Sequence, residues 1–188
     1  MRSDIERWEK KYSTKSQLSV QQHADPLLVS HKHLLNGTGL AIDLAAGTCG
    51  TSIHLARSGY SVIALDCSLT ALKIGQHLAI KSGVFVQGLV IDLDDYLLPK
   101  STFNLITCFR YLNRRLFPMI KWALNPGGRV VYKTFNQNHL EQTPGFAKEY
   151  LLRPGELAEA FEGLQITAYD DGVDSQQPYS YIIAQAPK

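Results

Sequence analysis

Three aspartates at the ends of apolar runs are the residues of this sequence best suited to binding chemistry. Asp43, Asp66 and Asp92 each lie at or just beyond the carboxyl end of a short run rich in Leu, Ile, Val and Ala. Such runs are typical of parallel strands that are buried on both faces. Carboxylates at successive strand ends can accept hydrogen bonds from ribose hydroxyls, so the pattern favours a nucleoside-binding site.

A turn of small residues follows the first run, and residues 45–50 read Ala-Ala-Gly-Thr-Cys-Gly. Backbone N–H groups in such a turn approach a ligand closely, and the turn leads through a helix to a second strand, as in a βαβ unit. The spacing Ala45-x-Gly47-x-x-Gly50 also resembles a damaged dinucleotide fingerprint, so a nicotinamide-dependent oxidoreductase is the alternative. Asp43 argues against it, because a pyrophosphate gains nothing from an anion at the end of the first strand.

Helices and strands that alternate along the chain must position these residues. The turn-rich segment 170–178 is too short for a crossover helix, so the last two strands should be antiparallel. The pattern therefore predicts an α/β fold with a doubly wound, mostly parallel sheet. The expected strands are 40–44, 61–65, 84–91, 103–109, 129–135, 164–169 and 179–186, and the expected helices are 3–12, 25–36, 50–58, 69–81, 114–124 and 154–161.

Length and composition restrict the class of protein. The chain has 188 residues, enough for one domain over 1–188, and a formal net charge of +2, too small to indicate a nucleic-acid partner. Three cysteines without close spacing argue against a disulfide framework and for a reducing compartment, and no apolar run is long enough to cross a membrane. We expect a cytoplasmic protein, a monomer or weak homodimer, without a membrane partner.

These residues together resemble the class I S-adenosylmethionine-dependent methyltransferases. More narrowly, the sequence is similar to the small single-domain tellurite-resistance and thiol methyltransferases, from about Trp8 to the C-terminus. The resemblance implies a Rossmann-like seven-stranded sheet ordered 3-2-1-4-5-7-6 with strand 7 antiparallel. It also implies that S-adenosyl-L-methionine lies across the carboxyl ends of the first four strands.

The resemblance assigns roles to individual residues. The loop after Asp43 would surround the methionine part of the cofactor, Asp66 would hold the ribose hydroxyls, and Asp92 would meet the adenine amine. Arg110 and Tyr111 follow the fourth strand, nearest the methyl group in the family, and are the candidate catalytic residues. The implied cofactor-binding set is Asp43, Ala45, Gly47, Cys49, Asp66, Cys67, Ser68, Asp92, Leu93 and Phe109.

Other parts of the chain have more than one interpretation. Residues 1–36 form an N-terminal helical region that either docks on the core or covers the ligand as a lid, and 136–152 is a candidate substrate-side segment. Arg114 is more simply a solvated helix start than a substrate contact. His31 and His33 would not face one another on a helix, so no metal site is expected. The sequence predicts methyl transfer to a small-molecule acceptor; the alternative, beside the oxidoreductase, is a protein that binds S-adenosylmethionine or S-adenosylhomocysteine without transfer activity.

Overall fold

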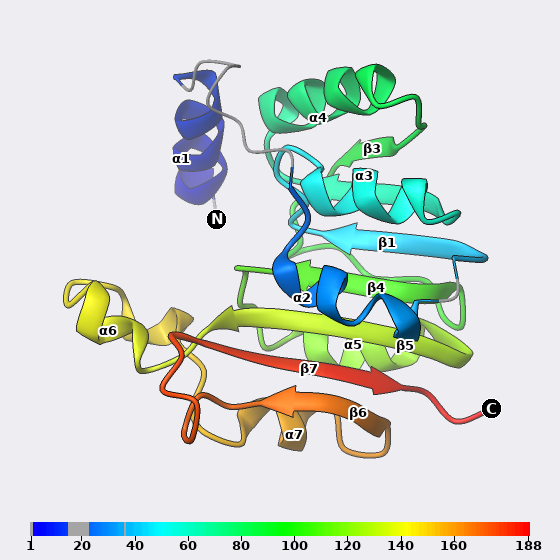
Figure 1. The fold of residues 1–188 in the computed structure, drawn as a ribbon. Helices are drawn as coiled ribbons and strands as arrows, with labels where there is room; N and C mark the ends of the chain where they lie inside the picture. Colours follow the sequence, from blue (N-terminus) through cyan, green and yellow to red (C-terminus); the bar gives the residue numbers. More distant parts are fainter. Residues whose placement is uncertain (1, 15–22, 36) are drawn as a thin grey trace. The chain divides into compact units, whose positions relative to one another are not determined.

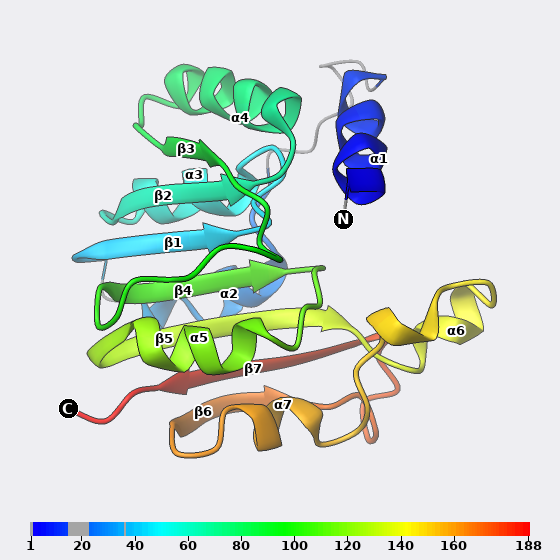
Figure 2. The ribbon, with the colours of Figure 1, turned by 180° about the vertical axis from the view of Figure 1, so that it is seen from behind.

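The computed structural model describes residues 2–14, 23–35 and 37–188. Seven strands form one mixed sheet in the order β3-β2-β1-β4-β5-β7-β6, and β7 is antiparallel to β5 and β6 (Figures 1 and 2). The strands are β1 (Leu40–Leu44), β2 (Ser61–Asp66), β3 (Gln87–Val90), β4 (Phe103–Phe109), β5 (Leu124–Phe135), β6 (Gln165–Asp170) and β7 (Tyr179–Gln185). The predicted α/β class, strand order and antiparallel last strand are confirmed.

Helices and two short 3₁₀ turns connect the strands. The helices are α1 (Arg2–Ser13), α2 (Pro26–Ser30), α3 (Gly50–Arg57), α4 (Leu69–Lys81), α5 (Leu116–Ala123), α6 (His139–Gln142) and α7 (Glu156–Ala160), and the 3₁₀ turns are Lys32–Leu34 and Lys148–Tyr150. None of these helices is long and apolar enough to span a lipid bilayer. The chain divides into two compact units, Met1–Tyr96 and Leu97–Lys188.

In the first unit, α3 and α4 pack against the parallel strands β1, β2 and β3 (Figure 1). Local signals set the helix starts: the Ser68 hydroxyl accepts the N–H of Ala71 at 3.1 Å and caps α4, and Asp25 accepts the N–H of Leu27 at 3.0 Å and caps α2. The α-helix that begins at Pro26 ends at Ser30, earlier than expected, and Asn36 lies outside the described residues.

In the second unit, α5 and α7 contribute aromatic side chains to the core around β5. Tyr132 and Phe161 are fully buried, and the ring of Phe117 meets them edge-on at centroid distances of 5.3 and 5.5 Å. Edge-to-face packing of this kind stabilises a core beyond the area that it buries. This packing fixes β5, and with it the residues that follow β5.

Several element boundaries differ from the prediction. The strand β5 begins at Leu124 rather than at residue 129, because residues 124–128 belong to the sheet, where Leu124 pairs with Phe103. A register shift follows that pair, and a side chain at Gly128 would lie 2.8 Å from the carbonyl oxygen of Phe103. Glycine is therefore needed at position 128 because β4 and β5 approach each other closely there.

Arg114, just before α5, is exposed as expected, but its guanidinium is also bound by other parts of the chain. Its Nε and Nη2 donate to the two carboxylate oxygens of Glu156 at 2.6 and 3.1 Å, and its remaining N–H groups bind the carbonyls of Glu149 and Leu151. Burial acts to raise the pKa of Glu156, but hydrogen bonds from Arg114 and from the N–H of Arg153 outweigh it and hold the pKa below its ordinary value. The two-point ion pair joins the start of α7 to the start of α5, and the two carbonyl contacts hold the end of segment 136–152 there.

Replacing Glu156 with Gln is expected to lower the free energy of unfolding by about 2 kcal/mol at neutral pH, because Arg114 loses its charged partner. The loss should shrink as the pH falls below the ordinary Glu value of 4.5. In that range the unfolded chain takes up a proton while the folded carboxylate stays ionised, so wild-type stability falls. Urea denaturation across this pH range measures the difference, with the exposed Glu159→Gln as control; a difference independent of pH would contradict the assignment.

Candidate cofactor-binding site

The Asp66 carboxylate joins the end of β2 to the loop that follows β1. Its Oδ2 accepts the N–H of Gly47 at 2.7 Å, and its Oδ1 accepts the N–H of Ser68 at 2.8 Å. Only 7% of Asp66 is exposed, and burial raises its pKa despite these two N–H donors. Hydrogen bonds from the side chain and the backbone of Cys67 also favour the charged carboxylate.

The loop between β1 and α3 is built from left-handed residues. Ala45, Gly47 and Cys49 have φ angles of 53°, 54° and 61°. Only glycine adopts this region without a steric cost, so the loop holds about 1–2 kcal/mol of backbone strain at each of the other two residues. The strain is held by the Asp66 hydrogen bond and by the N–H of Ala46, which donates to the carbonyl of Leu65 at 2.9 Å.

The Cys49 side chain turns into the protein, toward α4. It is fully buried, and a Cβ placed on Gly75 would lie 2.4 Å from its Sγ. Burial, with a smaller contribution from the charge of Asp43, raises the pKa of the thiol to about 12. Only the backbone of Cys49 therefore contributes to the surface of the loop. Its thiol stays protonated at neutral pH and fills the space beside Gly75.

The other two acids lie at the same strand ends, as the sequence predicts. Asp43 is 2% exposed and accepts a hydrogen bond of 2.6 Å from the hydroxyl of Ser52, which connects β1 to α3. Asp92 follows β3, and its Oδ1 accepts the N–H of Asp94 at 3.0 Å. Leu93, beside it, is buried. Asp66 thus binds the small-residue loop directly, through the N–H of Gly47.

The helix α1 contributes a residue that the sequence analysis missed. The carboxylate of Glu9 accepts the hydroxyl of Ser68 at 2.6 Å and both the hydroxyl and the N–H of Thr70, at the start of α4. These hydrogen bonds lower the pKa of Glu9. Tyr12 lies against the loop, since a Cβ on Gly47 would be 2.8 Å from its hydroxyl. Glu9 and Tyr12 are three residues apart and share a helix face. This spacing is the sequence signal from which the position of Glu9 could have been predicted.

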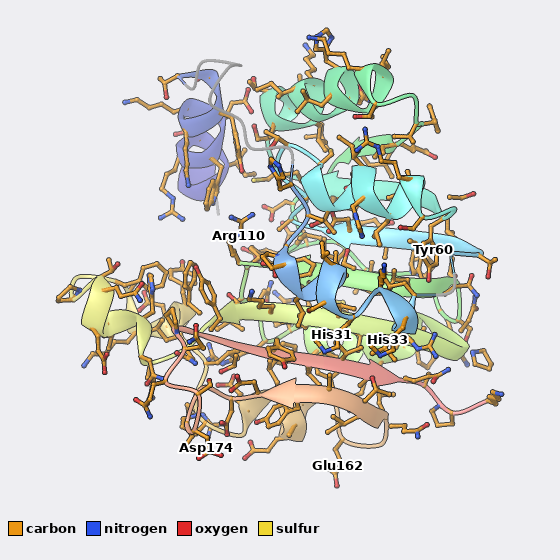
Figure 3. The ribbon with its side chains drawn as sticks, viewed as in Figure 1. His31, His33, Tyr60, Arg110, Glu162 and Asp174 are labelled. Carbon is orange, nitrogen blue, oxygen red and sulfur yellow. The ribbon has the colours of Figure 1, made fainter. Side chains whose placement is uncertain are left out.

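The remaining predicted residues belong to the second unit. Phe109 is buried at the carboxyl end of β4, and Tyr111 is half-buried, with its carbonyl accepting the hydroxyl of Tyr132 at 2.8 Å. Arg110 is exposed at the end of β4, with a left-handed φ of 56° (Figure 3). Its N–H donates to the carbonyl of Lys133 at 2.8 Å.

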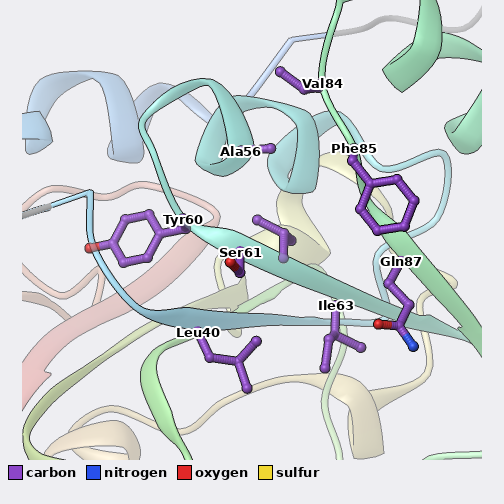
Figure 4. A pocket seen from close by; sticks show the side chains of 9 residues that line it. Leu40, Ala56, Tyr60, Ser61, Ile63, Val84, Phe85 and Gln87 are labelled. Carbon is purple, nitrogen blue, oxygen red and sulfur yellow. The ribbon is translucent and has the colours of Figure 1, made fainter.

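Two hollows in the first unit lie away from the three acids. One, of about 380 Å³, is lined by residues at the amino ends of β1 and β2, among them Leu40, Tyr60 and Ser61 (Figure 4). The other, of about 560 Å³, lies between α2 and α3. Asp43, Asp66 and Asp92 line neither hollow.

The described residues contain no group of three or more His, Cys, Asp or Glu side chains that could hold a metal ion. The expectation that His31 and His33 do not face one another is wrong, because α2 ends before His31 and brings their ring centroids to 6.1 Å (Figure 3). A pair of rings does not by itself make a metal site.

Comparison with known proteins identifies the class of fold. Residues 41–128, just under half of the chain, match the family described as a methyltransferase domain. No curated protein matches the sequence significantly. The matched segment covers most of β1, the loop that follows it, and all of β2, β3 and β4.

Solved structures with the same fold have low sequence identity. A structure reported for the conversion of a disulfide bond into a thioacetal group during echinomycin biosynthesis has a TM-score of 0.76 and 16% identity, over 98% of this chain and 92% of that chain. An S-adenosylmethionine-dependent methyltransferase from Mesorhizobium loti has a TM-score of 0.68 and 19% identity, over 85% and 96%. Geranyl diphosphate C-methyltransferase from Streptomyces coelicolor A3(2), solved with S-adenosyl-L-homocysteine, has a TM-score of 0.64 and 16% identity, over 85% and 74%.

The contact between Cys49 and Gly75 is testable through stability. Gly75→Ala is expected to lower the free energy of unfolding by about 2 kcal/mol, because the new methyl group overlaps the buried thiol. Adding Cys49→Gly should recover a large part of that loss, because it removes the thiol and because glycine accepts the left-handed φ. A double-mutant cycle by urea denaturation measures the coupling.

The matched control is Gly145→Ala, since no atom lies within 4 Å of a Cβ at that position. It should leave the stability nearly unchanged. Strictly additive effects of Gly75→Ala and Cys49→Gly would show that the two residues do not share the space.

Proposed function

We propose that this protein transfers a methyl group from S-adenosyl-L-methionine to a small-molecule acceptor. The observation that carries the proposal is the Asp66 carboxylate at the end of β2, which binds the Gly47 amide of the left-handed loop. The matched methyltransferase domain and the fold support it. Neighbours whose names include geranyl diphosphate and phosphoethanolamine support an acceptor of low molecular weight.

The residues of the first unit fit an adenosine-bearing cofactor. Asp66 would accept hydrogen bonds from the two ribose hydroxyls, beside Cys67 and Ser68. Asp43 would meet the ammonium group through water. Asp92 would accept the adenine amine, with buried Leu93 against the ring.

When bound, S-adenosylmethionine supplies a methyl group on a sulfonium centre that is open to in-line displacement. Attack by an anion cancels charge in the transition state, so alignment and exclusion of water supply most of the rate. The protein's contribution is therefore positional. Phe109 forms the buried end of β4, and Arg110 and Tyr111 would orient the acceptor. A general base is required only if the acceptor arrives protonated.

The finer classification also remains a proposal. The sequence resembles the tellurite-resistance and thiol methyltransferases, so thiols and metalloid oxyanions are the first acceptors to screen. Binding of S-adenosylhomocysteine without turnover of thiols, amines, hydroxyls or oxyanions would favour the alternative of a cofactor-binding protein without transfer activity. We expect a cytoplasmic monomer or weak homodimer, which size-exclusion chromatography with light scattering tests.

Asp66→Asn is expected to weaken S-adenosylhomocysteine binding at least tenfold, because an amide replaces one of the two acceptor oxygens. Isothermal titration calorimetry measures the affinity, and circular dichroism verifies that the variant is folded. Asp95→Asn changes an exposed acid on the connection after β3 and should bind like the wild type. Unchanged affinity in Asp66→Asn, or tighter binding of NAD than of S-adenosylhomocysteine, would overturn the proposal.

We also propose that residues 1–36 form a lid over the ligand, and this gives a second test. Residues 1, 15–22 and 36 of this region lie outside the described residues. Glu9→Gln is expected to increase the hydrogen-exchange rate of α1 amides several-fold, because Ser68 and Thr70 lose a charged acceptor. Glu6→Gln, an exposed change on the same helix, is the control. If S-adenosylhomocysteine protects α1 in the wild type and not in Glu9→Gln, the helix covers the ligand; equal exchange in both proteins would show that Glu9 does not hold it.

A further inference from the structure

A group of aromatic rings lies at the carboxyl end of β5, which we call the aromatic cluster: Phe135, His139, Phe146 and Tyr179. The centroid of Phe135 is 4.1 Å from that of His139, 5.3 Å from Phe146 and 5.0 Å from Tyr179. The ring of His139 meets Phe146 edge-on at 4.8 Å. Segment 136–152 thus supplies two rings, and the strands β5 and β7 supply the other two.

All four rings of the aromatic cluster are half-buried, in contrast to the fully buried Tyr132 and Phe161 of the core. The Nδ1 atom of His139 is enclosed and has no hydrogen-bond partner among the described residues. Rings that serve only to fill a core are normally enclosed on all sides. The cluster therefore keeps apolar surface available for a flat ligand.

Lys133 connects Arg110 to the aromatic cluster, because it contacts both. The Arg110 N–H binds the Lys133 carbonyl at 2.8 Å, and the Lys133 Nζ lies 5.0 Å from the ring centroid of Tyr179. Phe135 follows two residues beyond Lys133, about 7 Å along the strand. The backbone of Arg110 is thus close enough to the aromatic cluster for one ligand to contact both.

Arg110 also differs from the other arginines near the ends of these strands. Arg114 and Arg153 bind Glu156 and Glu159, whereas the guanidinium of Arg110 has no ion-pair partner in the described part of the chain. Its φ of 56° is strained for arginine, and such strain concentrates at functional positions. An exposed, unpaired guanidinium held in a strained conformation is suited to bind an anion.

We propose that the acceptor carries an anionic group beside a flat apolar body, with Arg110 binding the anion and the aromatic cluster stacking against the body. The positive charge of Lys133 lies on the same side and favours the anion. The inference rests on the proposed methyl transfer, but the subsite itself belongs to the second unit and can be tested by binding alone.

The test uses naphthoate, its neutral amide naphthamide, and acetate as probes. Saturation-transfer NMR titrations measure their affinities for the protein, with and without S-adenosylhomocysteine. Naphthoate should bind at least tenfold more tightly than naphthamide or acetate, because only naphthoate offers both the charge and the flat body.

Variants assign the two parts of the subsite. Arg110→Asn should weaken naphthoate binding about tenfold and leave naphthamide unchanged, and asparagine tolerates the left-handed φ, so the variant keeps its fold. Arg110→Lys should retain most of the naphthoate affinity. Phe146→Ala should weaken naphthoate and naphthamide alike, about fivefold. Arg115→Asn changes an exposed arginine five residues further on and is the matched control.

Equal naphthoate affinity in Arg110→Asn and in the wild type, or equal affinity of the wild type for naphthoate and naphthamide, would overturn the inference. Calorimetry with S-adenosylhomocysteine on the same samples separates the two proposals. If S-adenosylhomocysteine fails to bind while naphthoate binding depends on Arg110, the proposed methyl transfer fails and the anion subsite stands. If S-adenosylhomocysteine binds and naphthoate ignores Arg110, only the subsite fails.

Discussion

The hydrogen bond between the Asp66 carboxylate and the Gly47 amide is the constraint on which the first unit depends. It joins the carboxyl end of β2 to the loop after β1, beside the hydrogen bond from the Ala46 N–H to the carbonyl of Leu65. A buried carboxylate is costly unless donors compensate it, and here two backbone N–H groups do so. Because both donors are fixed backbone groups, the carboxylate is oriented before any ligand arrives, and α1 packs against the two residues that supply them.

Different interactions stabilise the two units. In the first, backbone strain at Ala45 and Cys49 is balanced by the Asp66 hydrogen bond and by the space at Gly75. In the second, the ion pair between Arg114 and Glu156 fixes the chain that follows segment 136–152. The first interaction fixes a short loop by its backbone, and the second fixes a long segment at its end only.

Much of the fold follows from local sequence signals. The strands β1 and β4 have the bounds that the apolar runs predict, and Ser68 caps α4 as expected, because period and capping act over a few residues. The missed contacts join residues far apart: Glu9 binds Ser68 across 59 positions, and Arg114 binds Glu156 across 42. No local pattern encodes such pairs. The direction of the Cys49 thiol likewise depends on a glycine that lies in another helix.

The two ends of segment 136–152 lie side by side at the end of β5. Asn136 and Leu152 form an isolated bridge, and the N–H of Leu152 donates to the carbonyl of Phe135 at 3.0 Å. Insertions or exchanges within this excursion therefore need not disturb strand pairing, since its two ends are already joined. Substitutions within the segment can therefore change the surface that it presents while the strand pairing on either side of it is kept.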